Sequence, residues 1–450
     1  MKKKEISGRK RSDARSTGFG SPIKSKEFFT EYSLLFIAII MMLFFSSCTK
    51  ESGEIMVAPE SSEGDISTAR FTIEQTISDE AQRNTIAFDG LAFLTGNVGS
   101  QSFLPPGKVA DYSGFQYLRD NDATNLGHNT SFVTIIAHNI LNILTSEQIG
   151  LFVARAKNQI ELINEFAYRR FPLLSAFRRL KEGDLPSGTT QLSKEAVMAY
   201  TAELYRIDGL ISYDRAKLFG SILSSLTDEQ KSKLDALKAL NGIGNWNSTL
   251  TDPLRALNLD RDVNVAVMTY ASEIYAWYAG SVAADVYFCP ERQGTYFGSF
   301  YLKDWPAMGN PNYTINEQLT ASAGEDFLNA LTAEQAEKVR NIVNLQKNAL
   351  LELIQKREAI SIELRRFISE GSANQATVLS LSERYGQLDG EISYYYATVF
   401  AQVYNSLSSE QKLKLTSLVQ QLGYVNPSGA FLYSQPANMP EIINTDFMFK

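Results

Sequence analysis

Residues suited to catalysis or metal binding are scarce in this chain, which has two histidines and two cysteines among 450 residues. His128 and His138 both lie in the first half, and the internal repeat described below aligns His138 with Glu325. A catalytic or metal-binding histidine would therefore be missing from the second copy, so we interpret both as ordinary histidines. Two cysteines are also too few for a disulfide scaffold or a cysteine-based zinc site.

One acidic segment begins like a calcium-binding loop but does not continue as one. Asp260, Asp262 and Asn264 alternate as calcium ligands do. However, Val265 stands where the loop needs glycine, and Ala271 stands where it needs the closing glutamate. We therefore expect no metal, no cofactor and no enzymatic activity.

The overall composition is that of a folded, acidic chain. Hydrophobic residues make up 44% and charged residues 21%, which excludes wholesale disorder. With 43 basic and 50 acidic residues the net charge is −7. This balance argues against a nucleic-acid partner, because such proteins bind by neutralising phosphates.

Residues 1–48 have the pattern of an export signal. A basic region is followed by an uncharged apolar run, residues 34–45, and then by small residues and Cys48. The run is shorter than the roughly 20 helical residues that span a bilayer, so it indicates a signal peptide. The sequence Phe-Ser-Ser-Cys that ends at Cys48 resembles a bacterial lipobox, in which the cysteine is lipidated. The alternative is a plain signal peptide with an incidental cysteine.

Removal of this segment would leave an acidic body on a lipid anchor. The segment holds nine of the basic and four of the acidic residues, so the remainder has a net charge of −12. Residues 49–70 are rich in Ser, Glu and Gly, which predicts a flexible tether. We expect an outer-membrane lipoprotein of the bacterial cell envelope, facing the periplasm or the cell surface and touching the membrane through its N-terminal lipid only.

The rest of the sequence contains a tandem repeat. The matching segments occur in the same order at offsets of 184, 187 and 181 residues: 112–120 with 296–304, 144–148 with 331–335, and 207–213 with 388–394. Such offsets require only small insertions. We predict two homologous modules, residues 71–240 and 254–425, followed by a C-terminal tail, residues 426–450.

Each module contains two copies of a helix-start motif. A Thr or Ser is followed three residues later by Gln, which is the spacing of a capping box. The Glu before each Gln lies in the first turn, where the helix dipole favours an anion. The motif residues are Leu144, Thr145, Gln148, Leu226, Thr227, Gln230, Leu331, Thr332, Gln335, Leu407, Ser408 and Gln411.

Long amphipathic helices are expected after these motifs. In the second copy, apolar residues spaced three and four apart run from Val339 to Phe367 and predict one buried helical stripe. In the first copy, Pro172 should interrupt the helix near Phe171. Because no alternating strand pattern occurs, we predict an all-α fold of two helical modules, each opened by a segment rich in aromatic residues and glycine.

The paired Leu-Thr-x-x-Gln motifs resemble those of the LTXXQ-motif family, whose familiar members are the periplasmic Spy and CpxP proteins. The resemblance covers the helical parts, residues 140–240 and 327–425. It implies all-helical, cradle-shaped dimers associated with envelope stress and with ATP-independent, chaperone-like holding of unfolded clients. Two modules on one chain would then mimic one dimeric cradle that binds client or envelope proteins. The aromatic openings and the acidic mature charge depart from the family's pattern.

Two duplicated arginines fall within the apolar stripes. Arg170 and Arg357 occupy equivalent positions, and a cation on a buried face needs a partner. The equivalent Asp208 and Asp389 are the candidates for a structural ion pair that locks two helices. The alternative is an arginine that binds a ligand.

A second arginine pair recurs close to the expected helix ends. The pair is Arg178-Arg179 in the first copy and Arg365-Arg366 in the second. Solvent exposure and the helix dipole would explain their positions. The alternative is a patch that binds carboxylate or phosphate groups.

Duplicated aromatic segments give an alternative function. Tyr112 and Tyr117 in the first copy correspond to Tyr296 and Tyr301 in the second, around a glycine. Such residues could stack a sugar or grip an extended peptide, which would make the chain a surface lipoprotein that binds a small ligand or glycan. They could equally be part of the core and its turns.

Overall fold

The structure, a computed structural model, describes residues 80–95, 131–240, 245–279, 293–295, 298–300, 306–307, 310–314, 323–421, 430–432, 435–437 and 441–450. The expected signal peptide with Cys48 and the expected tether lie outside the described residues. The described part of the chain is all-α, which confirms the fold class expected from the sequence.

Equivalent helical segments recur in the same order in the two copies, although the breaks between helices fall at different positions. The first copy contains α3 (Glu80–Thr95), α4 (Ser131–Leu141), α5 (Ser146–Tyr168), α6 (Phe171–Glu182), α7 (Lys194–Ser224) and α8 (Asp228–Ala239). The second contains α9 (Arg261–Ala279), α11 (Ala323–Ala330), α12 (Ala333–Arg340), α13 (Ile342–Ser369), α14 (Gln375–Ser406) and α15 (Ser409–Gln421).

Short elements supplement these helices. Two 3₁₀ turns are η3 (Arg255–Leu257) and η6 (Asp446–Met448). Antiparallel hairpins, which the sequence pattern does not predict, pair β1 (Gln293–Thr295) with β2 (Gly298–Phe300), β3 (Pro306–Ala307) with β4 (Asn310–Thr314), and β5 (Ala430–Leu432) with β6 (Gln435–Ala437).

Local sequence explains where the long helices begin and end. Helix α5 stops at Tyr168 and α6 starts at Phe171, with Pro172 in the first turn of α6, as the sequence predicts. Proline is tolerated there because first-turn N–H groups have no partner within the helix. In the second copy the predicted apolar stripe is buried along α12 and α13, from Val339 to Phe367.

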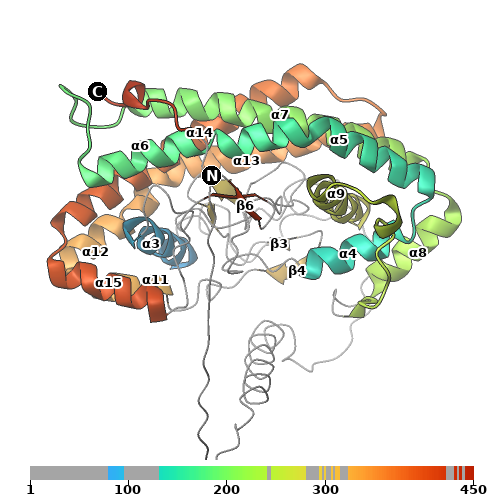
Figure 1. The fold of residues 1–450 in the computed structure, drawn as a ribbon, viewed down its shortest axis with the longest axis horizontal. Helices are drawn as coiled ribbons and strands as arrows, with labels where there is room; N and C mark the ends of the chain where they lie inside the picture. Colours follow the sequence, from blue (N-terminus) through green and yellow to red (C-terminus); the bar gives the residue numbers. More distant parts are fainter. Residues whose placement is uncertain are drawn as a thin grey trace, which may run out of the picture. The chain divides into compact units, whose positions relative to one another are not determined.

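The opening helix of each copy packs against the other copy. At the offset of 184, α3 corresponds to the last sixteen residues of α9. Yet α3 packs against α11, α12, α14 and α15, whereas α9 packs against α4, α5, α7 and α8. Figure 1 shows α3 beside α11 and α9 beside α4. The two copies are therefore interlocked, and the described residues from Glu80 onward belong to one compact unit.

The long helices α7 and α14 lie side by side and approach closely at glycines (Figure 1). A Cβ atom at Gly209 would lie 2.2 Å from Ser382 Oγ, and one at the equivalent Gly390 would lie 2.1 Å from Thr201 Oγ1. A Cβ atom at Gly386 would lie 2.3 Å from the carbonyl oxygen of Thr201. A larger residue at any of these positions would push the two helices apart.

The end of the expected C-terminal tail is packed against the connection between α6 and α7. Arg179 donates hydrogen bonds to Thr445 (3.0 Å) and to Asp446 (2.8 Å). The backbone N–H of Gln191 donates to the carbonyl oxygen of Lys450, and the N–H of Lys450 donates back to Gln191. The last residues of the chain are therefore a structural element of the first copy.

Candidate functional site

The Leu-Thr-x-x-Gln motifs form helix caps at all four positions. The hydroxyl of Thr227 accepts a hydrogen bond from the N–H of Gln230 (3.2 Å), and the Gln230 side chain accepts one from the N–H of Thr227 (3.1 Å). Thr332 with Gln335 makes the same reciprocal pair. The remaining two motifs, at the starts of α5 and α15, do so as well. The spacing therefore predicts the local structure correctly.

The glutamines of the two motifs in one copy also bind each other. Gln230 Nε2 donates to Gln148 Oε1 at 2.8 Å, and Gln411 Nε2 donates to Gln335 Oε1 at 2.7 Å. The same Nε2 groups of Gln230 and Gln411 donate to carbonyl oxygens that precede α5 and α12, those of Ile143 and Ala330. Each bridge thereby ties two helix starts that are about 80 residues apart, 82 and 76 respectively.

The bridges are polar networks enclosed by apolar side chains. Gln148, Gln230 and Gln335 are buried, and the motif leucines Leu144 and Leu226 pack into the core beside them. Buried amides are costly unless their donors and acceptors are used, and here the bridge uses them. The sequence carries the signal for this bridge, since glutamine recurs at the same motif position four times, but the spacing alone explains only the cap.

The duplicated arginines and aspartates are all buried. Asp208 and Asp389 are fully buried, and Arg170 and Arg357 are nearly so. Arg170 lies in the break between α5 and α6, as the N-cap residue of α6. This burial favours a structural role over ligand binding, because a charge so placed must be satisfied within the fold.

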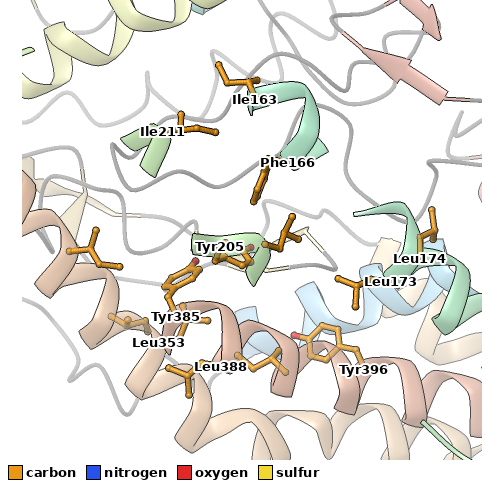
Figure 2. Close-up of a cluster of buried hydrophobic side chains, with 14 of the residues drawn as sticks. Ile163, Phe166, Leu173, Leu174, Tyr205, Ile211, Leu353, Tyr385, Leu388 and Tyr396 are labelled. Atoms are coloured by element: carbon orange, nitrogen blue, oxygen red, sulfur yellow. The ribbon is translucent and has the colours of Figure 1, made fainter. Parts of the chain in front are cut away.

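Tyr385 brings one of these arginines together with both aspartates. Burial raises the pKa of the Tyr385 phenol above its usual range. The Arg357 guanidinium, which is hydrogen-bonded to the phenol, lowers that pKa, whereas the charges of Asp389 and Asp208 raise it. Figure 2 shows Tyr385 next to Tyr205 in the buried cluster, and the two ring centroids are 4.9 Å apart. The phenol therefore stays protonated at neutral pH. The specific Arg170–Asp208 and Arg357–Asp389 pairings remain predictions.

A buried hydrogen bond between a tyrosine and a glutamine occurs twice, at equivalent glutamines of the two copies. Tyr270 donates to Gln159, and Tyr396 donates to the equivalent Gln346, both at 2.8 Å. The two tyrosines come from different helices, α9 and α14, so the two copies reach the same contact by different routes.

An ion pair without any exposed surface accompanies one of these contacts. Arg215 Nη1 lies 2.6 Å from Glu273 Oε1, and both side chains are fully buried. In the repeat, Tyr396 corresponds to Arg215, and Asp89 corresponds to Glu273. Burial, together with the charge of Asp89, raises the pKa of Tyr396 well above its usual value. The ion pair, which joins α7 of the first copy to α9 of the second, therefore has no counterpart at the equivalent positions.

The sequence-based interpretation of Arg178 and Arg365 as solvated residues is wrong. Both are buried, Arg178 completely. The guanidinium of Arg178 lies 4.8 Å from the ring centroid of Phe93, and that of Arg365 lies 4.9 Å from the ring centroid of the equivalent Trp277. Arg178 also donates a hydrogen bond to the Phe93 carbonyl oxygen. The rings belong to the opening helices, so helical periodicity around the arginines could not reveal what covers them.

The remaining candidate residues fall into two groups. Tyr112, Tyr117, Tyr296 and Tyr301 lie outside the described residues, as does His128. The other histidine of the chain lies in α4, with its Nε2 3.9 Å from Asp252 Oδ1.

The described ranges contain neither a metal-binding cluster nor a membrane-spanning helix. No three or more His, Cys, Asp and Glu side chains converge there as a metal site would require. In the same ranges, no helix combines the length and the apolar character needed to cross a membrane.

Comparison with known proteins gives no relative. The sequence matches no protein-family model. Comparison with curated proteins and comparison with solved structures found no match either.

Proposed function

We propose that this chain is a lipid-anchored protein of the bacterial cell envelope that binds client or partner proteins without ATP, in the manner of the LTXXQ-motif family. Binding would be reversible and would require no cofactor and no chemical step. The membrane would be contacted through the lipid at Cys48 alone.

The observation that carries this proposal is the paired construction of the four motifs. Each copy joins its two helix starts by a direct glutamine–glutamine hydrogen bond, at 2.8 Å in one copy and 2.7 Å in the other. A motif used twice in the same three-dimensional role is more specific than four separate helix caps. It therefore supports the resemblance to a family whose members carry two such motifs each.

The interlocked copies give further support. Small members of the family are expected to act as dimers, and here α3 and α9 exchange places between two related halves of one chain. One polypeptide thereby provides the paired helical scaffold that two subunits would otherwise provide.

Exposed apolar side chains on three helices would supply the contacts that the proposed binding needs. Leu413 on α15 is 71% exposed, and Ile362 on α13 and Leu151 on α5 are about half exposed, at 51% and 47%. Apolar side chains in water bind the apolar segments of an unfolded protein by the hydrophobic effect, weakly at each point and without sequence specificity.

The test is suppression of aggregation. The purified chain from residue 49 onward is titrated, without ATP, into a test protein that is unfolding in denaturant, beside an inert protein of similar net charge. Protection near a one-to-one ratio supports the proposal. Aggregation equal to that with the inert protein would contradict it.

A matched pair of variants identifies the binding surface. Leu413→Gln removes the most exposed of these apolar side chains, and Lys414→Gln changes its neighbour on the same exposed part of α15. We expect the first variant to require more protein for the same protection and the second to behave like the wild type. Equal activity of all three proteins would show that α15 takes no part in holding clients.

A further inference from the structure

One cluster of cations stands apart from the duplicated architecture. Lys181, at the end of α6, is only 3% exposed, and its Nζ lies 4.9 Å from the ring centroid of Tyr404 and 5.8 Å from that of Phe93. Lys412 Nζ lies 4.2 Å from the Tyr404 ring, and Arg178 stacks on Phe93. Three cations from α6 and α15 therefore meet around two rings, which α3 and α14 provide.

The tandem repeat shows which members of this cluster the fold itself requires. The Arg178–Phe93 contact recurs as Arg365–Trp277, so that contact is structural. Lys181, however, corresponds to Ile368, which is 38% exposed in the second copy.

Tyr404 likewise departs from the repeat. Its equivalent in the first copy is Leu223, which is packed against the hydrophobic core. The same helices thus pack without a buried lysine and without a tyrosine at these positions. Both residues are additions specific to one side of the molecule.

The charges around Lys181 make its protonated form costly. The pKa of Lys181 is lowered to about 7, chiefly by burial; the charges of Arg178 and Lys412 also lower it, and Glu182 raises it. The Glu182 carboxylate lies 3.8 Å from Lys181 Nζ and is half exposed. A second anion placed among the three cations would relieve both the repulsion and the desolvation.

We propose that Arg178, Lys181 and Lys412, with the rings of Phe93 and Tyr404, form a binding site for a small oxyanion, a carboxylate or a phosphate group. Arg178 supplies a planar guanidinium and the lysines supply two ammonium groups, which are the donors that such oxygens bind best. Lys412 is exposed and Lys181 is buried, so the cluster reaches the protein surface at Lys412.

The experiment measures thermal stability of the chain from residue 49 as sodium phosphate or sodium acetate replaces sodium chloride at constant ionic strength and pH 6. Phosphate stabilises many proteins without binding, and that effect grows with concentration without saturating. A bound anion instead produces a rise in midpoint that saturates. We expect saturation in the wild type with at least one of the two anions, and which anion saturates identifies the ligand class.

Three variants assign the response to the cluster. Lys181→Ile installs the residue that the other copy already accommodates, and Lys412→Gln removes an exposed charge without disturbing the core. We expect each to weaken the apparent affinity by about tenfold or more, because each removes a charged donor. Lys231→Gln changes the residue equivalent to Lys412 and should leave the response intact.

Two results would overturn the proposal. One is a midpoint that rises without saturating for both anions in the wild type, which would show a general salt effect only. The other is a saturating response that survives in both Lys181→Ile and Lys412→Gln, which would place the anion elsewhere. A response that weakens at pH 9, where Lys181 has lost its proton, supports the assignment.

Discussion

The contact between α7 and α14 can be tested with a single methyl group. Gly386→Ala would place its Cβ atom 2.3 Å from the carbonyl oxygen of Thr201 and 2.9 Å from the Cα atom of Ala202. Both of these are backbone atoms, so no rotation of a side chain can relieve the overlap. The two helices must move apart along a contact that the whole core depends on.

The magnitude follows from the opposing effects of the substitution. Extra volume in a packed core costs about 1–3 kcal/mol and sometimes more. Replacing glycine by alanine inside a helix by itself stabilises the folded state by about 0.5–1 kcal/mol. Because the overlap is with backbone, we expect the upper part of the range, a net loss of about 2–3 kcal/mol in the free energy of unfolding.

The same substitution elsewhere provides the control. Gly150 also lies within a helix, α5, but its Cβ atom would have no neighbour within 4 Å. Gly150→Ala should therefore raise the free energy of unfolding by about 0.5–1 kcal/mol. Urea denaturation followed by circular dichroism measures both variants. Stability of Gly386→Ala equal to or above the wild type would refute the close approach of α7 to α14.

A double-mutant cycle locates the strain more finely. Gly390→Ala would meet Thr201 at its Oγ1 atom, 2.1 Å away, and at its Cβ atom only at 3.2 Å. Removing the hydroxyl with Thr201→Ala should therefore recover most of the loss caused by Gly390→Ala. The same second substitution should recover little of the loss at Gly386, where the obstacle is backbone. Equal recovery at both sites would contradict the geometry.

Three further predictions concern the buried polar groups. Arg215→Met should cost about 3–5 kcal/mol, since it leaves Glu273 buried without its ion-pair partner, and adding Glu273→Leu should restore most of the loss in urea denaturation. Gln230→Ala should lower the free energy of unfolding by about 2–3 kcal/mol in the same assay, because it removes a helix cap and two buried hydrogen bonds. The control Glu229→Gln, at the neighbouring residue, should change that free energy by less than about 0.5 kcal/mol. The Lys181 pKa is lowered from 10.5 to about 7, so the folded state disfavours the proton. Relative to Lys181→Ile, the wild type should therefore gain about 4 kcal/mol of stability as pH rises from 7 to 10.5.

Each of these has an outcome that contradicts it. A single Arg215 variant as stable as the double variant would show that the unpaired Glu273 carboxylate does not cause the loss of stability. A Gln230 variant no weaker than the Glu229 variant would remove the structural role of the glutamine bridge. A stability difference between wild type and Lys181→Ile that stays constant across that pH range would mean that the lysine keeps an ordinary pKa in the folded state.

Local rules in the sequence predict the individual helices well. The capping spacing places the start of α8 at Thr227 and of α12 at Thr332, and Pro172 separates α5 from α6, as the structure shows. Burial of Arg170 and Arg357 also follows from the apolar stripes. These features depend on residues three or four positions apart, which is the range over which helical periodicity carries information.

Relations between distant helices are not predictable in this way. Periodicity identifies the buried face of a helix but not the helix that covers it. The exchange of α3 and α9 between copies is an example, since α3 packs against helices of the second copy although it precedes the first copy in the sequence. The burial of Arg178 depends on the same exchange, because the ring that covers it lies 85 residues earlier.

Comparison of the two copies within this chain distinguishes residues that the fold requires from residues that have an additional role. A contact made in both copies, such as the glutamine bridge or the arginine–aromatic stack, is explained by what the two halves share, which is the fold. A buried charge made in one copy cannot be explained in that way, since the other copy shows that the same helices pack without it. Burying such a charge costs free energy, and the fold does not require a lysine at position 181. An anion among Arg178, Lys181 and Lys412 would lower that cost, whereas the client-binding role of the scaffold as a whole would not.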